Sequence, residues 1–291
     1  PCLMLKPVLN YPFLLDNKVI YPATFKPDYL KRLCQSIPIF VYTCLSTYYP
    51  EHEYWSDNML DERHLDWLIY RCNLMRDTTK ASLDLQESPI TAWTIVVRDY
   101  PDYVISKLSS ILGSSSYSIR FLRLKDALGK TQLYYRNNIT VPSIRDDSKQ
   151  YLHDIGHTGE YVISRIDSDD EYTPSFGSII RISASIVASN YSFDKPWLLQ
   201  TPIGRQVQYP ELITYATTWP NPAFVNLLMS REFLESSKFD HLATPYSFPH
   251  DNPTHELGNS VISSHVPMWN MNIHSSNIQN SLFPWSTQVN Q

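Results

Sequence analysis

Three aspartates, Asp167, Asp169 and Asp170, lie within four positions of the segment SRIDSDDEY. They follow the apolar segment EYVISRI, residues 160–166, which is typical of a buried strand. Carboxylates this close repel one another unless a positive charge lies between them. Carboxylate oxygens suit a hard divalent cation such as Mg²⁺ or Mn²⁺, which also takes oxygens from water and phosphate. The sequence therefore predicts a divalent metal site at the end of this strand.

A structural explanation of the same carboxylates stays open. Thr173 and Pro174 are typical of the first residues of a helix, and Asp169 and Asp170 would then favour its N-terminal end. A calcium-binding EF-hand loop is excluded, because the position that must be glycine in such a loop is Tyr172 here.

The amino-acid composition and net charge exclude several classes of binding site. The chain has only 7 glycines and no G-x-G, which excludes the dinucleotide fingerprint, the phosphate-binding P-loop and the G-x-S-x-G nucleophile elbow. A net charge of -5 gives no basic surface for nucleic acid. No apolar run approaches the roughly 20 residues of a membrane span. A phosphorylated ligand would therefore be bound through a metal or cationic side chains.

Strands and helices alternate along the first two thirds of the chain. The predicted strands cover residues 37–45, 92–97, 117–123 and 160–166, and the predicted helices cover 61–86, 101–113, 146–156 and 173–190. This order predicts an α/β fold with a mostly parallel central sheet and helices on both faces. After residue 195 the pattern becomes mixed, with two strands expected to join through Gly204. We expect an irregular N-terminal extension at 1–37 and a single domain at 38–291.

The cysteines indicate a reducing compartment. None of the four forms a C-x-x-C pair, so buried, reduced thiols are expected rather than a zinc or redox site. Together with the lack of a visible signal sequence, this favours the cytoplasm. The chain begins at Pro1, so an N-terminal anchor lost by truncation stays open.

The segment SRIDSDD resembles the D-x-D segment of nucleotide-sugar glycosyltransferases of the GT-A fold. More narrowly, it is similar to the R-[LI]-D-x-D-D motif of a rhamnosyltransferase-like family found in bacteria and large DNA viruses. Other segments resemble the same family in the same order: FVYTCLS (40–46), YRCNLMRDTTKASLDLQ (70–86), WTIVVRDYPDYVISKL (93–108), NPAF (221–224) and PMWNMNIHSSN (267–277). The resemblance covers roughly residues 38–280, and it implies a GT-A-like fold.

The resemblance also implies roles for particular residues. Asp167 and Asp169 would bridge Mn²⁺ or Mg²⁺ to the diphosphate of a nucleotide sugar, and His274 would complete the metal site. The residues expected to bind the nucleotide sugar are Thr43, Arg71, Asp99, Arg165 and Asp167. The implied partners are a nucleotide diphosphate sugar donor and a glycan or glycoprotein acceptor, such as one that receives rhamnose or another hexose or deoxyhexose.

An inverting enzyme of this kind needs a general base within reach of the acceptor hydroxyl. Glu256 is the expected base because it lies late in the chain, where the fold usually places this group, and Asp251 is the second candidate. A solvated loop carboxylate is the alternative for each of them, and a retaining enzyme would need no such base.

Two other functions use the same aspartates. A catalytically silent GT-A-like module would bind nucleotide or glycan without turnover. A metal-dependent phosphohydrolase would release phosphate or a nucleotide and would need no acceptor.

Overall fold

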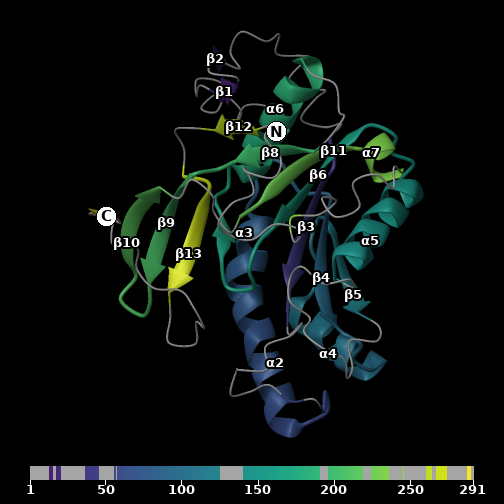
Figure 1. Cartoon of the computed structure of the whole chain (residues 1–291). Coiled ribbons are helices and arrows are strands. Elements are labelled where there is room, and N and C mark those ends of the chain that lie inside the picture. The colour runs from purple at the N-terminus through teal and green to yellow at the C-terminus, as the bar shows by residue number, and fades with distance from the viewer. Residues whose placement is uncertain are drawn as a thin grey trace.

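The computed structural model describes residues 37–45, 58–124, 140–190, 196–218, 224–235 and 267–273, the single residues 56 and 245, and the short segments 13–15, 18–20, 260–263 and 287–289. Within these residues, the chain forms two sheets with helices packed around the larger one (Figure 1).

The central sheet has nine strands in the order β2-β1-β12-β8-β11-β6-β3-β4-β5. Its strands are β1 (Phe13–Leu15), β2 (Lys18–Ile20), β3 (Ile39–Cys44), β4 (Ala92–Arg98), β5 (Ser118–Leu124), β6 (Glu160–Arg165), β8 (Trp197–Gln200), β11 (Asn226–Ser230) and β12 (Ser260–Ser263). The four strands β6, β3, β4 and β5 run parallel to one another, and β11 runs antiparallel to β6. The expected α/β fold with a mostly parallel central sheet is confirmed.

Helices cover both faces of the central sheet, which is why its inner strands are apolar on both sides. Every residue of β4 is buried. One core cluster joins the sheet to α2 (Glu62–Met75), α4 (Asp102–Leu112) and α6 (Phe176–Asn190), and a second joins it to α5 (Thr140–Asp154) and α7 (Arg231–Glu235). In Figure 1, α5 and α7 lie on the side opposite to α2.

The first long helix is not uniform. Asp61 starts α2 by accepting a hydrogen bond from the backbone N–H of His64 at 3.1 Å. After Met75 the chain forms a π-helical turn, η4 (Arg76–Lys80), before it returns to an α-helix in α3 (Ala81–Asp84). The predicted helix over 61–86 is confirmed, but its hydrogen-bond pattern changes in the middle.

Two other helix starts differ from the expectation. Helix α5 begins at Thr140 rather than near residue 146, and its first turn buries Thr140, Val141 and Ile144. Helix α6 begins at Phe176, because Thr173 and Pro174 form a turn before it, in which the Phe176 N–H bonds the Thr173 carbonyl at 3.0 Å.

A second sheet stands beside the central one, on the left of Figure 1, in the order β14-β10-β9-β13-β7. Its strands are β7 (Glu171–Tyr172), β9 (Ile203–Gln208), β10 (Ile213–Thr218), β13 (Trp269–Ile273) and β14 (Thr287–Gln288). The expectation that Gly204 joins two strands is wrong, since Gly204 lies inside β9. A Cβ at Gly204 would come within 2.1 Å of the Trp269 ring, so this close approach needs a glycine.

The N-terminal segment is not wholly irregular. Strand β1 pairs with β2 and with β12, which comes from the last part of the chain, so residues 13–15 and 18–20 extend one edge of the central sheet. A domain boundary near residue 37 stays a prediction. No helix among the described residues is both long and apolar enough to cross a membrane.

Candidate functional site

The three aspartates lie where the two sheets meet. Because β6, β3, β4 and β5 are parallel, their carboxyl ends lie along the same side of the central sheet. Ligands of open α/β sheets bind at this carboxyl-terminal edge. Residues 166–170, here called the aspartate loop, leave β6 at this edge and lead directly into β7 of the second sheet. The loop therefore joins the two halves of the molecule.

Asp169 is paired with an arginine from α2. Its Oδ2 lies 3.3 Å from Nη1 of Arg71, and the side chains are only 7% and 13% exposed. The other terminal nitrogen of Arg71 donates to the Ser168 hydroxyl at 2.5 Å. Arg71 thus supplies positive charge and fixes the middle of the aspartate loop, as a forked guanidinium can.

Asp167 is the most open of the three carboxylates. Its side chain is 38% exposed, whereas the side chain of Arg165, which bonds it through Nη2 at 3.3 Å, is fully buried. The Arg165 carbonyl accepts a hydrogen bond from the Tyr172 hydroxyl at 2.7 Å, so the end of β6 is fixed against β7. Asp167 is therefore held by the buried Arg165 on its inner side, while its carboxylate remains accessible from the solvent.

Asp170 points into the protein. It is 1% exposed, and its Oδ1 accepts a hydrogen bond from the Asn272 backbone N–H at 3.0 Å. The pKa of Asp170 is raised well above its ordinary value, first by burial and then by the negative charges of Asp169 and Asp167. We infer that Asp170 anchors the loop, and that Asp167 and Asp169 are the carboxylates left to meet a ligand.

The backbone of the loop is held from both sides. The Thr79 hydroxyl, from η4, lies 2.8 Å from the Asp170 carbonyl and 3.2 Å from that of Asp167. From the second sheet, Nδ2 of Asn272 donates to the Asp169 carbonyl at 2.6 Å. The sequence interpretation missed both residues, although Thr79 and Asn272 lie in two of the segments that carry the family resemblance.

The chain that leaves the loop is fixed by α3 and the residues after it. The Ser82 hydroxyl accepts a hydrogen bond from the Tyr172 N–H at 3.2 Å. Gln86 donates to the Thr173 carbonyl and accepts from the Gly177 N–H, both at 2.9 Å. These contacts give a physical role to Ser82 and Gln86, both of which lie in the segment 70–86 that carries the family resemblance.

The predicted site residues fall into three groups. Arg71, Arg165, Asp167 and Asp169 are brought together, and Asp99 is exposed just after the end of β4, at the same edge of the sheet. Thr43 is fully buried in β3, where its hydroxyl accepts a hydrogen bond from the Trp93 indole at 3.0 Å. The predicted bases, Glu256 and Asp251, and the predicted metal ligand His274 lie outside the described residues.

The charges around the loop fit a divalent cation. Four carboxylates, those of residues 167, 169, 170 and 171, stand against the guanidinium groups of Arg71 and Arg165, so negative charge remains even with Asp170 protonated. Mg²⁺ is often held by only one or two carboxylates together with phosphate and water. Asp167 and Asp169 fit this arrangement, while no group of three or more His, Cys, Asp or Glu side chains suited to a metal occurs in the described part of the chain.

The alternative, that the aspartates serve the following helix, finds no support in their contacts. Helix α6 begins only at Phe176. The carboxylate of Asp169 instead bonds Arg71 on α2, and that of Asp170 bonds the backbone of β13.

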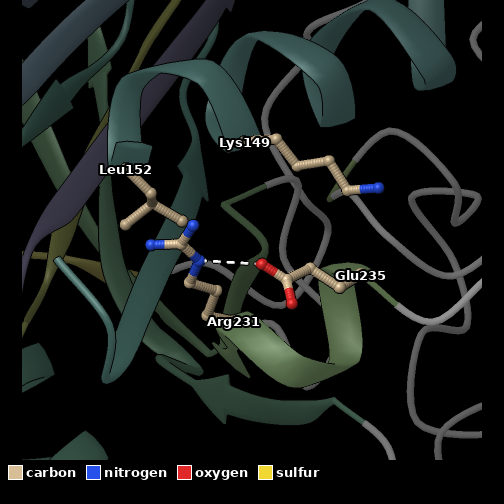
Figure 2. Close-up of a pocket in the computed structure, with 4 residues that line it drawn as sticks. All are labelled: Lys149, Leu152, Arg231 and Glu235. Carbon is tan, nitrogen blue, oxygen red and sulfur yellow. Dashed lines mark hydrogen bonds and ion pairs between the residues drawn. The ribbon is translucent and has the colours of Figure 1, made fainter. Parts of the chain in front are cut away.

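A separate cavity of about 200 Å³ lies between α5 and α7 (Figure 2). Its lining includes Lys149, Leu152, Arg231 and Glu235, and Nε of Arg231 pairs with Glu235 at 2.9 Å. Strand β11 ends beside the first residue of β6, so α7 starts at the sheet edge opposite to the aspartate loop. This cavity therefore does not belong to the aspartate site.

Comparison with known proteins gives distant structural similarities only. No family model matches the chain, and no curated protein sequence does. A protein from Desulfovibrio desulfuricans G20, whose proposed class is nucleotide-diphospho-sugar transferase, is similar over 80% of this chain and 80% of its own, with 8% identity and a TM-score of 0.35. A mycobacterial protein is similar over 93% of this chain and 78% of its own, with 9% identity and a TM-score of 0.41.

The S. aureus protein TarS, solved as residues 1–349 with UDP, is similar over 81% of this chain and 61% of its own, with 8% identity and a TM-score of 0.40. At these TM-scores the similarities carry no weight for function.

Proposed function

We propose that this protein is a metal-dependent glycosyltransferase that moves a sugar from a nucleotide diphosphate sugar to a glycan acceptor, with inversion at the transferred carbon. The sugar is rhamnose or another hexose or deoxyhexose, and the acceptor is a glycan or glycoprotein. The observation that carries the proposal is the pair of carboxylates, Asp167 and Asp169, held beside two arginines at the ligand-binding edge of a parallel sheet.

In this proposal Asp167 and Asp169 bind Mn²⁺ or Mg²⁺, and His274 completes the protein ligands. When bound, the cation neutralises the charge that develops on the diphosphate leaving group. Arg71 supports this site from behind, because it holds Asp169 and Ser168 in place and adds a positive charge to the same region. Asp170 stays buried and keeps the loop fixed to β13.

The nucleotide is assigned to the open edge of the sheet beside the loop. Arg165 and Arg71 contribute cationic charge there, and Asp99, exposed after β4, is placed to accept hydrogen bonds from a ribose or a base. Thr43 is kept in the proposed nucleotide site only for its position near the end of β3, since its hydroxyl bonds the Trp93 indole.

The acceptor hydroxyl must lose a proton as the new bond forms. We assign this task to Glu256, with Asp251 as the second candidate. The glycan acceptor and the rhamnosyl specificity in this proposal come from the family resemblance, and the cytoplasmic location comes from the cysteine pattern and the lack of a visible signal sequence.

Nucleotide binding tests the proposal directly. UDP, TDP, GDP and CMP are each added with and without Mn²⁺, and the shift in thermal unfolding is measured with calorimetry as the second method. A ligand at 100 times its dissociation constant adds about 2.7 kcal/mol of stability to the folded state. Stabilisation by one nucleoside diphosphate that requires Mn²⁺ is the expected result, and it also identifies the donor nucleotide.

No response to any nucleotide from a folded sample would refute the proposal. Two further measurements separate the alternatives. A phosphohydrolase would release phosphate or nucleotide at the same rate with and without acceptor, and a silent module would bind the nucleotide without any turnover.

A further inference from the structure

The π-helical turn η4 stands directly behind the aspartate loop. The Ala81 N–H bonds the Arg76 carbonyl, five residues back, instead of the carbonyl four residues back as in an α-helix. As a result three consecutive residues, Thr78, Thr79 and Lys80, are buried, whereas α2 buries a residue only every third or fourth position. Such turns are frequent at functional sites.

The Thr79 hydroxyl is directed to the backbone of the aspartate loop. It lies 2.8 Å from the Asp170 carbonyl and 3.2 Å from the Asp167 carbonyl, which are 91 and 88 positions away in the sequence. The Asp167 carbonyl also accepts from the Asp170 N–H at 3.4 Å, which closes a turn between them. A single hydroxyl hydrogen is therefore shared between the two ends of the turn that carries Asp169.

Thr79 follows Arg71 along the same continuous helical segment. Arg71 contacts the side chains of Ser168 and Asp169, and Thr79 contacts the backbone on either side of them. One helical segment thus fixes both the direction of the Asp169 carboxylate and the path of the loop. The hydroxyl has no charge of its own and is fully buried, so its contribution is geometric.

We propose that Thr79 is a positioning residue for the metal site: its hydroxyl holds the aspartate loop so that Asp167 and Asp169 face the same cation. The proposal rests on the function proposed above. It assigns to the π-helical turn the task of placing this hydroxyl, because the turn buries Thr79 against the loop together with both of its neighbours.

The chain provides a matched control in Thr78. This residue is also buried in η4, but its hydroxyl bonds the Leu74 carbonyl of its own helix at 2.8 Å. Thr78→Val and Thr79→Val remove the same group from adjacent positions of the same turn. Only Thr79→Val removes a bond to the aspartate loop, and Thr79→Ser restores the hydroxyl.

The experiment has two readouts on the three variants. Mn²⁺ is titrated alone, with free Mn²⁺ followed by electron paramagnetic resonance, and hydrogen exchange is followed on a peptide that covers residues 166–173. We expect Thr79→Val to bind Mn²⁺ between about twofold and tenfold more weakly, which is the range for one lost hydrogen bond. Exchange in the loop should become faster in this variant, and Thr79→Ser should restore both values.

Thr78→Val should change neither value, even if it lowers the melting temperature as much as Thr79→Val does. Equal Mn²⁺ affinity and equal loop exchange in Thr78→Val and Thr79→Val would overturn the proposal. If the wild-type protein binds no Mn²⁺, alone or with a nucleotide, the proposed function itself fails, and the exchange data still decide whether Thr79 holds the loop.

Discussion

The side-chain amide of Asn272 donates a hydrogen bond to the carbonyl of Asp169 at 2.6 Å, although the two residues are 103 positions apart. The backbone N–H of Asn272 also bonds the carboxylate of Asp170. Strand β13 of the second sheet therefore holds the loop that carries the proposed metal ligands.

Asp169→Asn should abolish the Mn²⁺ dependence of nucleotide binding, because it removes the charge and keeps the shape of the side chain. We expect the nucleoside diphosphate affinity in Mn²⁺ to fall at least about tenfold, a difference of about 1.4 kcal/mol. Calorimetry measures this, and Asp146→Asn is the control, since Asp146 is 64% exposed in α5. An Asp169→Asn variant that binds like the wild type would show that the metal site is wrongly assigned.

Arg71→Met should lower the free energy of unfolding by about 3–5 kcal/mol, because Asp169 is only 7% exposed and would lose this cationic partner. Added Mn²⁺ should recover more stability in this variant than in the wild type, since the cation supplies the missing charge. Urea denaturation with and without Mn²⁺ measures both effects.

The control for this change is Arg76→Met, one turn further along. Arg76 is 42% exposed and pairs with Asp77, which is 61% exposed, so a much smaller loss of stability than that of Arg71→Met is expected. Equal losses in the two variants would argue against a special role for Arg71.

Asp147→Asn should destabilise the protein without weakening ligand binding. The carboxylate of Asp147, 8% exposed on α5, accepts two hydrogen bonds from Arg120 at 2.7 and 3.1 Å and one from the Tyr42 hydroxyl at 2.8 Å. The asparagine would lose the charge that pairs with the partly exposed Arg120, at a cost of about 1.5–3 kcal/mol. Urea denaturation gives the loss, and an unchanged Mn²⁺ affinity separates this network from the aspartate site.

Alkaline pH should destabilise the protein through its buried tyrosines. Burial raises the pKa of Tyr42, Tyr161 and Tyr172 well above the ordinary value of about 10. The unfolded chain therefore loses these protons first as the pH rises. Stability is fully present below pH ~10 and falls as the pH increases from there toward the raised pKa values. Urea midpoints measured from pH 7 to pH 11 test this.

Tyr161→Phe isolates one of these groups. In the part of the chain that is described, the Tyr161 hydroxyl is buried and has no hydrogen-bond partner, so its removal should leave stability at pH 7 unchanged or raise it by up to about 1 kcal/mol. The alkaline loss should become shallower by one proton. A variant with the same alkaline slope as the wild type would show that Tyr161 is ionised as easily in the folded protein as in the unfolded one.

Local patterns predicted the elements because each pattern reflects a local cause. The apolar, β-branched runs predicted β3, β4 and β6, since a strand covered on both faces is mostly apolar. The apolar stripe of Leu65, Leu68, Ile69, Cys72 and Met75 predicted α2, and Leu68, Cys72 and Met75 are buried in it. Where the expectation was wrong, a distant partner decided: Gly204 lies inside β9 because Trp269, from β13, packs against it.

The features of the site also divide into those that the sequence determined and those that only the tertiary structure decided. The sequence by itself determined that three aspartates follow a core strand. They need positive charge nearby in whatever fold the chain adopts, because like charges at this spacing repel. Only the tertiary structure decided how they differ: Asp170 is turned inward to Asn272, Asp169 is paired with Arg71 and Asp167 is left open. The hydrogen bonds from Thr79 and Asn272 that hold the loop span about 90 to 100 positions, and no local spacing encodes such contacts, since they form only when the packed helix and the second sheet meet.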